Sequence, residues 1–133
     1  MSLSCCFNRT LHIKAFQFQC QKIPKKNINL KAEYQVTRDA YIAFEKEWEK
    51  KVDYSQLNLQ EQIIHSKHKE AIENFHWSYI DPESGNKALT RFRHYLRKTC
   101  CGNACRHCIY NHENVNEDIK KTKRFNTAFW VNS

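Results

Sequence analysis

Four of the chain's seven cysteines fall within the stretch CCGNACRHC, residues 100–108. A Cys-x2-Cys pair lets two sulfurs converge on one metal ion at about 2.3 Å, and Gly102 tolerates the tight backbone that would bring the earlier cysteines round. Thiolate ligands suit zinc or an iron–sulfur cluster. The sequence therefore predicts a metal site whose ligands are Cys100, Cys101, Cys105 and Cys108.

The adjacent cysteines complicate this ligand set. Because the side chains of neighbouring residues usually diverge, one of Cys100 and Cys101 can fall outside the site. His107, His112 or His94 would then supply the remaining ligand. Basic residues surround the cluster without a single acid. Such cations stabilise thiolates, but they also attract phosphate.

Two other interpretations of the cluster stay open. Cys105 and Cys108 have the spacing of a redox-active pair, although the βαβ pattern of a thioredoxin-like site is missing. The cysteines could also be inert. No serine–histidine–acid set, phosphate-binding loop or pair of carboxylates stands out, so the sequence leans against an enzyme without deciding the question.

The net charge of +8 is distributed unevenly along the chain. Residues 1–32 hold six basic side chains and no acid, residues 33–83 carry a net charge of −5, and residues 84–112 carry +6. A nucleic-acid partner is therefore possible, but a uniformly basic binding face is not indicated.

Residues 1–32 form a basic arm. Leu3, Phe7 and Leu11 lie four residues apart, on one face of a helix, in a segment rich in basic and hydroxylated residues. This pattern is typical of a mitochondrial transit peptide and predicts a protein of the matrix or of the matrix-facing surface of the inner membrane. A disordered basic tail is the alternative. No run approaches the roughly 18 apolar residues of a membrane-spanning helix, so no transmembrane segment is expected.

Residues 33–76 are predicted to form an antiparallel helical hairpin. We expect Thr37 to cap the first helix and Asn58 to cap the second, where Glu61 completes a capping box. The first helix is marked by an apolar stripe at three- and four-residue spacing, made of Tyr41, Phe44, Trp48 and Val52.

Three histidines of this region, His65, His68 and His76, could suggest a second metal site. They flank Lys67 and Lys69 on what the pattern indicates is the solvated face, and no cysteine or carboxylate completes a ligand set nearby. We therefore expect them to be exposed and free of metal.

Residues 77–133 are predicted to contain a β-hairpin, the cysteine module and a tail. Strong turn residues at 81–85 indicate the hairpin. Thr90 and Asn116 are each expected to begin a short helix, and the apolar tail is expected to pack inward. The predicted fold class is α+β, mostly α, in one domain: a helical hairpin, a short β-hairpin and a metal-stabilised cysteine knot.

Residues 79–115 resemble a small uncharacterised domain-of-unknown-function family. Its members read roughly Y-x-D-P-x-T-G, then T-x-x-x-H-L-x-R-G, then C-C-G-x-x-C-R-H-C-P-Y-G-H. The knot is also similar to the short "oxidoreductase-like" cysteine domain. Departures from the pattern are Tyr95, Thr99, Ile109 and Asn111. The resemblance implies that the four intact cysteines are the ligand set, and it implies no established activity.

These observations predict a non-catalytic metal-binding accessory subunit or assembly factor of a mitochondrial complex, with the respiratory chain as one candidate complex and other protein subunits as partners. One alternative is an iron–sulfur electron-transfer protein. Another is an RNA-binding protein of the mitochondrial ribosome, which would use the basic segment 87–106 with Phe92 or Tyr95.

Overall fold

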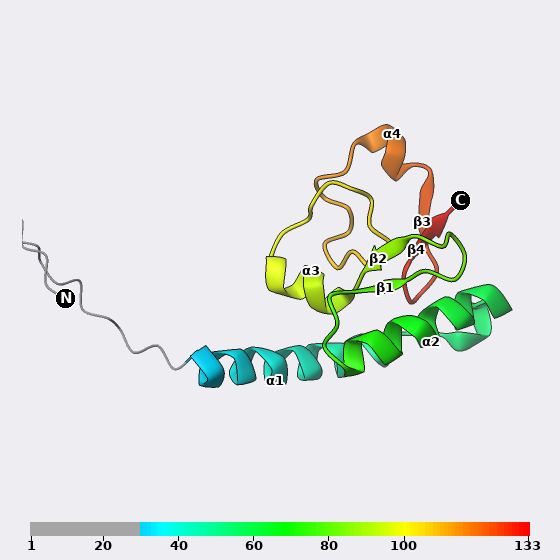
Figure 1. The fold of residues 1–133 in the computed structure, drawn as a ribbon. Helices are drawn as coiled ribbons and strands as arrows, with labels where there is room; N and C mark the ends of the chain where they lie inside the picture. The colour runs from blue at the N-terminus through cyan, green and yellow to red at the C-terminus, as the bar shows by residue number, and fades with distance from the viewer. Residues whose placement is uncertain (1–29) are drawn as a thin grey trace, which may run out of the picture.

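The computed structural model describes the backbone of residues 30–133 and the side chains from Glu33 onward. The predicted amino-terminal arm, residues 1–32, lies outside the described residues except for its last three, which open the first helix. Figure 1 shows an α+β molecule that is mostly helical, as predicted, with two long helices on one side. None of the described helices is both long enough and apolar enough to cross a membrane.

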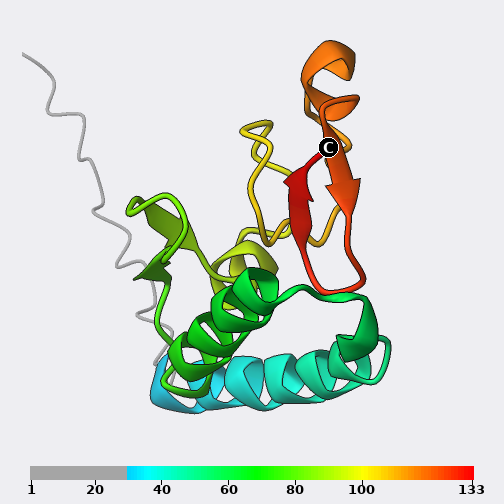
Figure 2. The ribbon, with the colours of Figure 1, turned by 90° about the vertical axis from the view of Figure 1, so that its right-hand side faces the viewer.

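The two long helices form the predicted hairpin. α1 covers Leu30–Glu49 and α2 covers Leu59–Glu73, with a short 3-10 helix, η1 (Tyr54–Gln56), in the connection. In Figures 1 and 2, α2 returns across α1. The predicted capping box is confirmed, because the Asn58 side chain accepts from the Glu61 N–H while the Glu61 carboxylate accepts from the Asn58 N–H.

The prediction that Thr37 begins the first helix is wrong. α1 already begins at Leu30, and the Thr37 hydroxyl donates to the Glu33 carbonyl one turn earlier (3.0 Å). A threonine inside a helix can use its hydroxyl in this way. Residues 30–36 contain no glycine or proline that would stop the helix, so it extends toward the amino terminus.

The predicted β-hairpin is confirmed. β1 (Ser78–Ile80) pairs antiparallel with β2 (Lys87–Leu89), and β1 also packs on α2. The chain then enters α3 (Arg91–Arg97), whose predicted cap, Thr90, accepts a hydrogen bond from the Arg93 N–H. This hairpin therefore delivers the chain from the long helices to the cysteine loop.

The carboxyl-terminal tail packs inward, as predicted, but within a second hairpin. Asn116 caps α4 (Glu117–Lys120), and β3 (Lys123–Phe125) then pairs antiparallel with β4 (Trp130–Asn132). Phe129, just before β4, is fully buried. The sequence did not indicate this hairpin because strands of three residues show too little alternation to be recognised.

The core of the described residues consists of three small clusters. One joins the start of α2 to the tail, one lies between α1, α2 and α3, and one lies in the cysteine loop. Figure 2 shows the loop and the β3–β4 hairpin above the layer of long helices. Their buried members are, in order, Leu57, Ile64, Ala128 and Phe129; Tyr41, Ile72 and Phe92; and Cys100, Cys108 and Val115.

Candidate metal centre

The cysteine loop lies between α3 and α4 and brings the four predicted sulfur ligands together as two close pairs. Lys98 ends α3 in the left-handed conformation and turns the chain into the loop. The Sγ atoms of Cys101 and Cys105 lie 3.1 Å apart, and those of Cys100 and Cys108 lie 3.9 Å apart. All four are free thiols.

Backbone N–H groups point at two of the sulfurs. Those of Tyr110 and His112 reach the sulfur of Cys108, and that of Asn103 reaches the sulfur of Cys101. N–H dipoles around a sulfur stabilise the thiolate, which is the form that binds a metal. The loop contains an unusual share of left-handed residues, namely Gly102, Ala104, Asn111 and His112.

The thiols differ in acidity. Burial, followed by the sulfurs of Cys101, Cys108 and Cys100, raises the pKa of Cys105 to about 12. Burial also raises the pKa of Cys108. Burial acts on Cys101 too, but hydrogen bonds from the Cys105 thiol and the Asn103 N–H outweigh it and lower the pKa of Cys101. A metal bound here would displace protons that Cys105 and Cys108 hold tightly, so its affinity would rise with pH.

Side chains from the surrounding chain hold the loop's backbone in place. A methyl group at Gly102 would meet the Asn114 carbonyl oxygen at 3.0 Å, so the chain packs closely there. Three loop carbonyls accept side-chain hydrogen bonds: that of Cys100 from Asn114 Nδ2 (2.9 Å), that of Cys105 from His112 Nε2 (2.9 Å) and that of Cys108 from Trp130 Nε1 (3.1 Å).

The sulfur separations match a metal site in part. A tetrahedral centre with bonds of about 2.3 Å places its sulfurs about 3.8 Å apart. The Cys100–Cys108 separation of 3.9 Å fits this edge, whereas the Cys101–Cys105 separation of 3.1 Å is shorter. In the part of the chain that the structure describes, no three His, Cys, Asp or Glu side chains are arranged as an ion site. Metal loading would require Cys101 and Cys105 to separate by about 0.7 Å.

The histidines named as alternate ligands have other contacts. His107 Nε2 lies 2.7 Å from the Tyr79 hydroxyl, and the His107 ring stacks on His68 with centroids 3.8 Å apart. His112 packs its ring against Trp130 at 4.2 Å. Within residues 33–133, Nδ1 of both His107 and His112 is buried without a hydrogen-bond partner. Their role as ligands stays a prediction.

The prediction that His65 and His68 face solvent is wrong. Both are buried, and His68 Nε2 accepts a hydrogen bond from the Arg91 N–H (3.1 Å). His76 is exposed, as predicted. The signal in the sequence was helical spacing, which places His65 and His68 on the same face of α2 as Ile64. Of the flanking lysines, Lys67 is exposed, whereas Lys69 donates to Glu49, which His65 also contacts.

The basic residues around the cysteines divide into paired and unpaired ones. Arg106 pairs with Asp81 (2.8 Å) and Glu83 (2.6 Å), and Arg91 pairs with Glu45. The two paired residues, Arg91 and Arg106, therefore stabilise the fold. The residues of α3 and its end that form no ion pair within the described chain are Arg93, Arg97 and Lys98.

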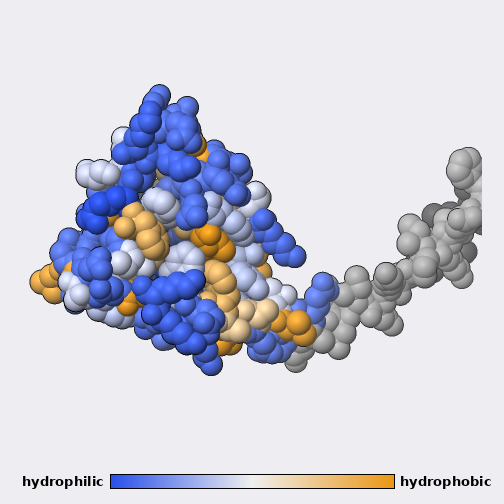
Figure 3. Space-filling view, turned by 180° about the vertical axis from the view of Figure 1, so that it is seen from behind, coloured by the Kyte–Doolittle hydropathy of each residue, from blue (hydrophilic) through white to orange (hydrophobic). Residues whose placement is uncertain are grey.

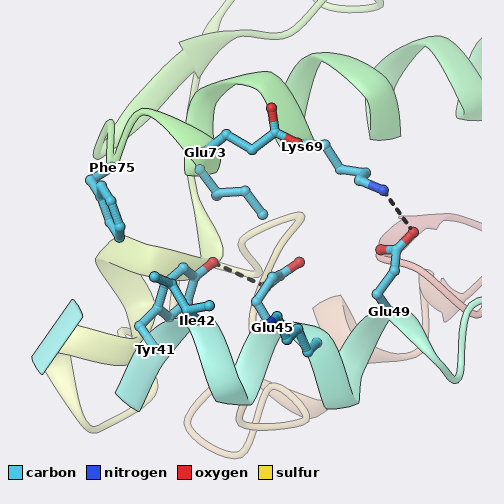
Figure 4. A pocket seen from close by; sticks show the side chains of 9 residues that line it. Tyr41, Ile42, Glu45, Glu49, Lys69, Glu73 and Phe75 are labelled. Carbon is cyan, nitrogen blue, oxygen red and sulfur yellow. Dashed lines mark hydrogen bonds and ion pairs between the residues drawn. The ribbon is translucent and has the colours of Figure 1, made fainter. Parts of the chain in front are cut away.

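A separate groove of about 400 Å³ lies between α1 and α2 (Figure 4). The Tyr41 hydroxyl donates to Glu45, and Lys69 donates to Glu49, so these polar groups are paired with one another. Figure 3 shows the molecule from behind, where the apolar surface is broken into separate patches among hydrophilic side chains. The apolar lining of the groove includes Ile42, Ile72 and Phe75.

Comparison with known proteins finds a match over part of the chain. A family model described as "Family of unknown function (DUF5522)" matches residues 67–114. The matched segment runs from the middle of α2 through the whole cysteine loop. This agrees with the predicted resemblance to a small uncharacterised family, while the similarity to the oxidoreductase-like domain stays a prediction. No solved structure matches the chain.

Proposed function

We propose that the loop binds one zinc ion or one iron–sulfur cluster through Cys100, Cys101, Cys105 and Cys108, and that the metal stabilises the loop rather than performing catalysis. The observation that carries the proposal is the presence of four free thiols in one loop, arranged as two pairs with separations of 3.1 and 3.9 Å. The N–H groups directed at Cys101 and Cys108 add support, because such donors stabilise a thiolate ligand.

The charge around the loop fits such a centre. Four thiolates around a divalent ion carry a net charge of −2, as does an oxidised two-iron, two-sulfur cluster coordinated by four cysteines. Arg97 lies close enough to Cys101 to favour its thiolate. A negative centre would thus have an unpaired cation beside it.

Metal analysis of the purified protein tests the proposal. Protein isolated without oxygen should contain one zinc per chain and be colourless, or contain iron and sulfide and be brown. Replacing Cys108 with serine should abolish the bound metal. Replacing Cys20, which lies in the basic arm, should leave it unchanged. Metal-free protein from its native source would contradict the proposal.

We propose that the protein is an accessory subunit or assembly factor of a mitochondrial complex, in which the metal module presents a rigid surface to other subunits. The acid-free arm supports import. Import into isolated mitochondria, followed by separation of native complexes, should recover the chain in a larger assembly. Recovery only as a free monomer in the cytosol would contradict it.

An exposed aromatic–cation pair favours RNA as a second candidate partner. Trp77 is 54% exposed, and the Arg93 guanidinium lies over its ring at 4.7 Å. Phe92, one of the residues predicted to stack on bases, is fully buried and cannot do so. Binding of a single-stranded RNA that weakens steeply with salt, and weakens again in Trp77→Ala, would support this candidate. Salt-insensitive association with proteins alone would exclude it.

A further inference from the structure

The four sulfurs of the loop fall into two unlike pairs. Cys101 and Cys105 are the closer pair and are both half-buried. Cys100 and Cys108 are farther apart and both buried, packed with Val115. The pair with the shorter distance between its sulfurs is therefore also the more accessible pair.

The closer pair is arranged for bond formation. A disulfide has an S–S length of about 2.05 Å, so the Cys101 and Cys105 sulfurs need to approach by about 1 Å. The connecting residues form a turn in which Gly102 and Ala104 are left-handed and Asn103 is exposed. A small-molecule oxidant can reach this side of the loop without opening the core.

The wider pair is held apart and shielded. The Cys100 and Cys108 sulfurs, 3.9 Å apart, would have to approach by about 1.9 Å to form a disulfide. The carbonyls of both residues are held by side chains, Asn114 and Trp130, whereas in the closer pair only the Cys105 carbonyl is held, by His112. This pair is therefore the poorer candidate for oxidation.

We propose that Cys101 and Cys105 are the oxidisable side of the metal centre. A small-molecule disulfide such as oxidised glutathione converts this pair to a disulfide and releases the metal, while Cys100 and Cys108 stay reduced. The release of metal rests on the proposed function, because it requires that all four sulfurs bind it. The choice of pair rests on geometry and burial alone.

The chemistry balances as a two-electron exchange. The sulfur of one cysteine of the pair attacks the disulfide of oxidised glutathione, which forms a mixed disulfide and expels one glutathione thiolate. The other cysteine sulfur then attacks the mixed disulfide, which forms the Cys101–Cys105 bond and expels the second glutathione thiolate. The two cysteines lose two electrons, glutathione gains them, and solvent or the cysteine thiols supply the two protons.

Disulfide mapping of the full-length, metal-loaded protein tests this proposal. After treatment with oxidised glutathione, the remaining thiols are alkylated and the unreduced chain is digested with trypsin. Cleavage after Lys98, Arg106 and Lys120 separates residues 99–106 from residues 107–120. The expected result is a 99–106 peptide that has lost two hydrogens, with Cys100 alkylated, beside a 107–120 peptide with Cys108 alkylated.

Other outcomes overturn the choice of pair. A disulfide that links the two peptides would mean that Cys108 is oxidised, and an unchanged pair of peptides would mean that neither cysteine of the closer pair reacts. Metal analysis before oxidation tests the proposed function separately. A metal-free protein that still closes Cys101–Cys105 would overturn the metal centre while supporting the assignment of the reactive pair.

Release of metal provides a second readout. A colorimetric metal indicator should record one metal centre lost for each disulfide formed, and a dithiol reductant with added metal should restore it. If the Cys101–Cys105 disulfide formed while the protein kept all of its metal, disulfide formation would not release the metal, which would contradict the proposal. It would also show that the two buried cysteines hold the metal with other ligands.

Discussion

Arg91 connects parts of the chain that lie far apart in the sequence. Its guanidinium is 0% exposed and donates to both carboxylate oxygens of Glu45 on α1, at 3.0 and 2.5 Å. It also donates to the Ala128 carbonyl in the tail (3.1 Å) and lies over the Trp48 ring. A buried cation of this kind depends on its partners, because an uncompensated charge is expensive in the protein interior.

We predict that Glu45→Gln destabilises the protein. The substitution removes the negative charge beside Arg91 while leaving a side chain of the same shape, so the free energy of unfolding should fall by about 3 kcal/mol. Urea denaturation followed by circular dichroism measures this difference.

The neighbouring residue Glu47 provides the control. Among the described side chains it pairs only with Lys50 at the surface, where both side chains are more than two-thirds exposed (68% and 69%). Glu47→Gln should leave the denaturation midpoint unchanged. Equal midpoints for Glu45→Gln and the parent protein would show that the Arg91–Glu45 pair is not required for stability.

His94 is predicted to make stability depend on pH. Burial, reinforced by Arg97, Arg93 and His112, lowers the pKa of His94 to about 4. An unfolded histidine takes up its proton near pH 6.5. Between these two pH values the unfolded state binds the extra proton, so the His94 contribution to stability is fully present above about pH 6.5 and is lost as the pH falls toward 4.

Removal of this histidine measures the effect. His94→Gln should reduce the slope of the free energy of unfolding against pH by up to about 1.4 kcal/mol per pH unit in this window. His76→Gln, at an exposed position, is the matched control and should keep the parent slope. If the free energy of unfolding of His94→Gln had the same slope against pH as that of the parent protein, the folded parent protein would accommodate a protonated His94.

At the scale of elements, the β3–β4 hairpin supports the cysteine loop. Trp130 donates its backbone N–H to the Arg106 carbonyl (2.8 Å) and its indole N–H to the Cys108 carbonyl (3.1 Å). Its ring also packs against His112. The tail therefore positions one end of the candidate metal centre, although it is more than twenty residues away in the sequence.

We predict that Trp130→Phe weakens metal binding without unfolding the helices. The substitution deletes the indole donor to the Cys108 carbonyl, and loss of such a supporting hydrogen bond lowers metal affinity by about tenfold or more. Competition with a chromogenic chelator measures the affinity. Trp77→Phe, which changes an exposed tryptophan, should match the parent protein. Equal metal affinities for the parent protein, Trp130→Phe and Trp77→Phe would show that the β3–β4 hairpin does not support the candidate metal centre.

At the scale of the whole molecule, we expect two of the core clusters to differ in how far their stability depends on a bound metal. The cluster of Tyr41, Ile72 and Phe92 consists of apolar side chains on three helices, whereas that of the loop contains Cys100 and Cys108. Apolar burial stabilises the first without an ion. In the loop cluster two of the three buried side chains are proposed metal ligands, so its stability would depend on the metal.

Chelation is therefore predicted to loosen one part of the molecule selectively. Hydrogen exchange in the presence of a strong chelator should increase over residues 99–115, while the amides of α1 and α2 keep their protection. Mass spectrometry of peptic fragments resolves these segments. An increase shared equally by the helices would indicate that the molecule unfolds as one unit when the metal is removed.

Local interactions explain which structural predictions were correct. Asn58 and Glu61 interact across one helical turn, Thr90 receives the N–H of Arg93, and the 81–85 turn depends on residues within five positions. Such contacts form wherever these residues occur together. The clustering of the cysteines likewise follows from their spacing, since four residues within nine positions cannot be far apart.

The tertiary structure decided what depends on distant partners. The spacing of the cysteines does not say that Cys101 faces Cys105 while Cys100 faces Cys108, because that pairing follows from the left-handed turns of the loop. Nor does the sequence place Glu45 beside Arg91, 46 residues away. Burial and charge pairing arise only after helices and hairpins pack together, and the free energy of those contacts depends on the whole fold rather than on any local pattern.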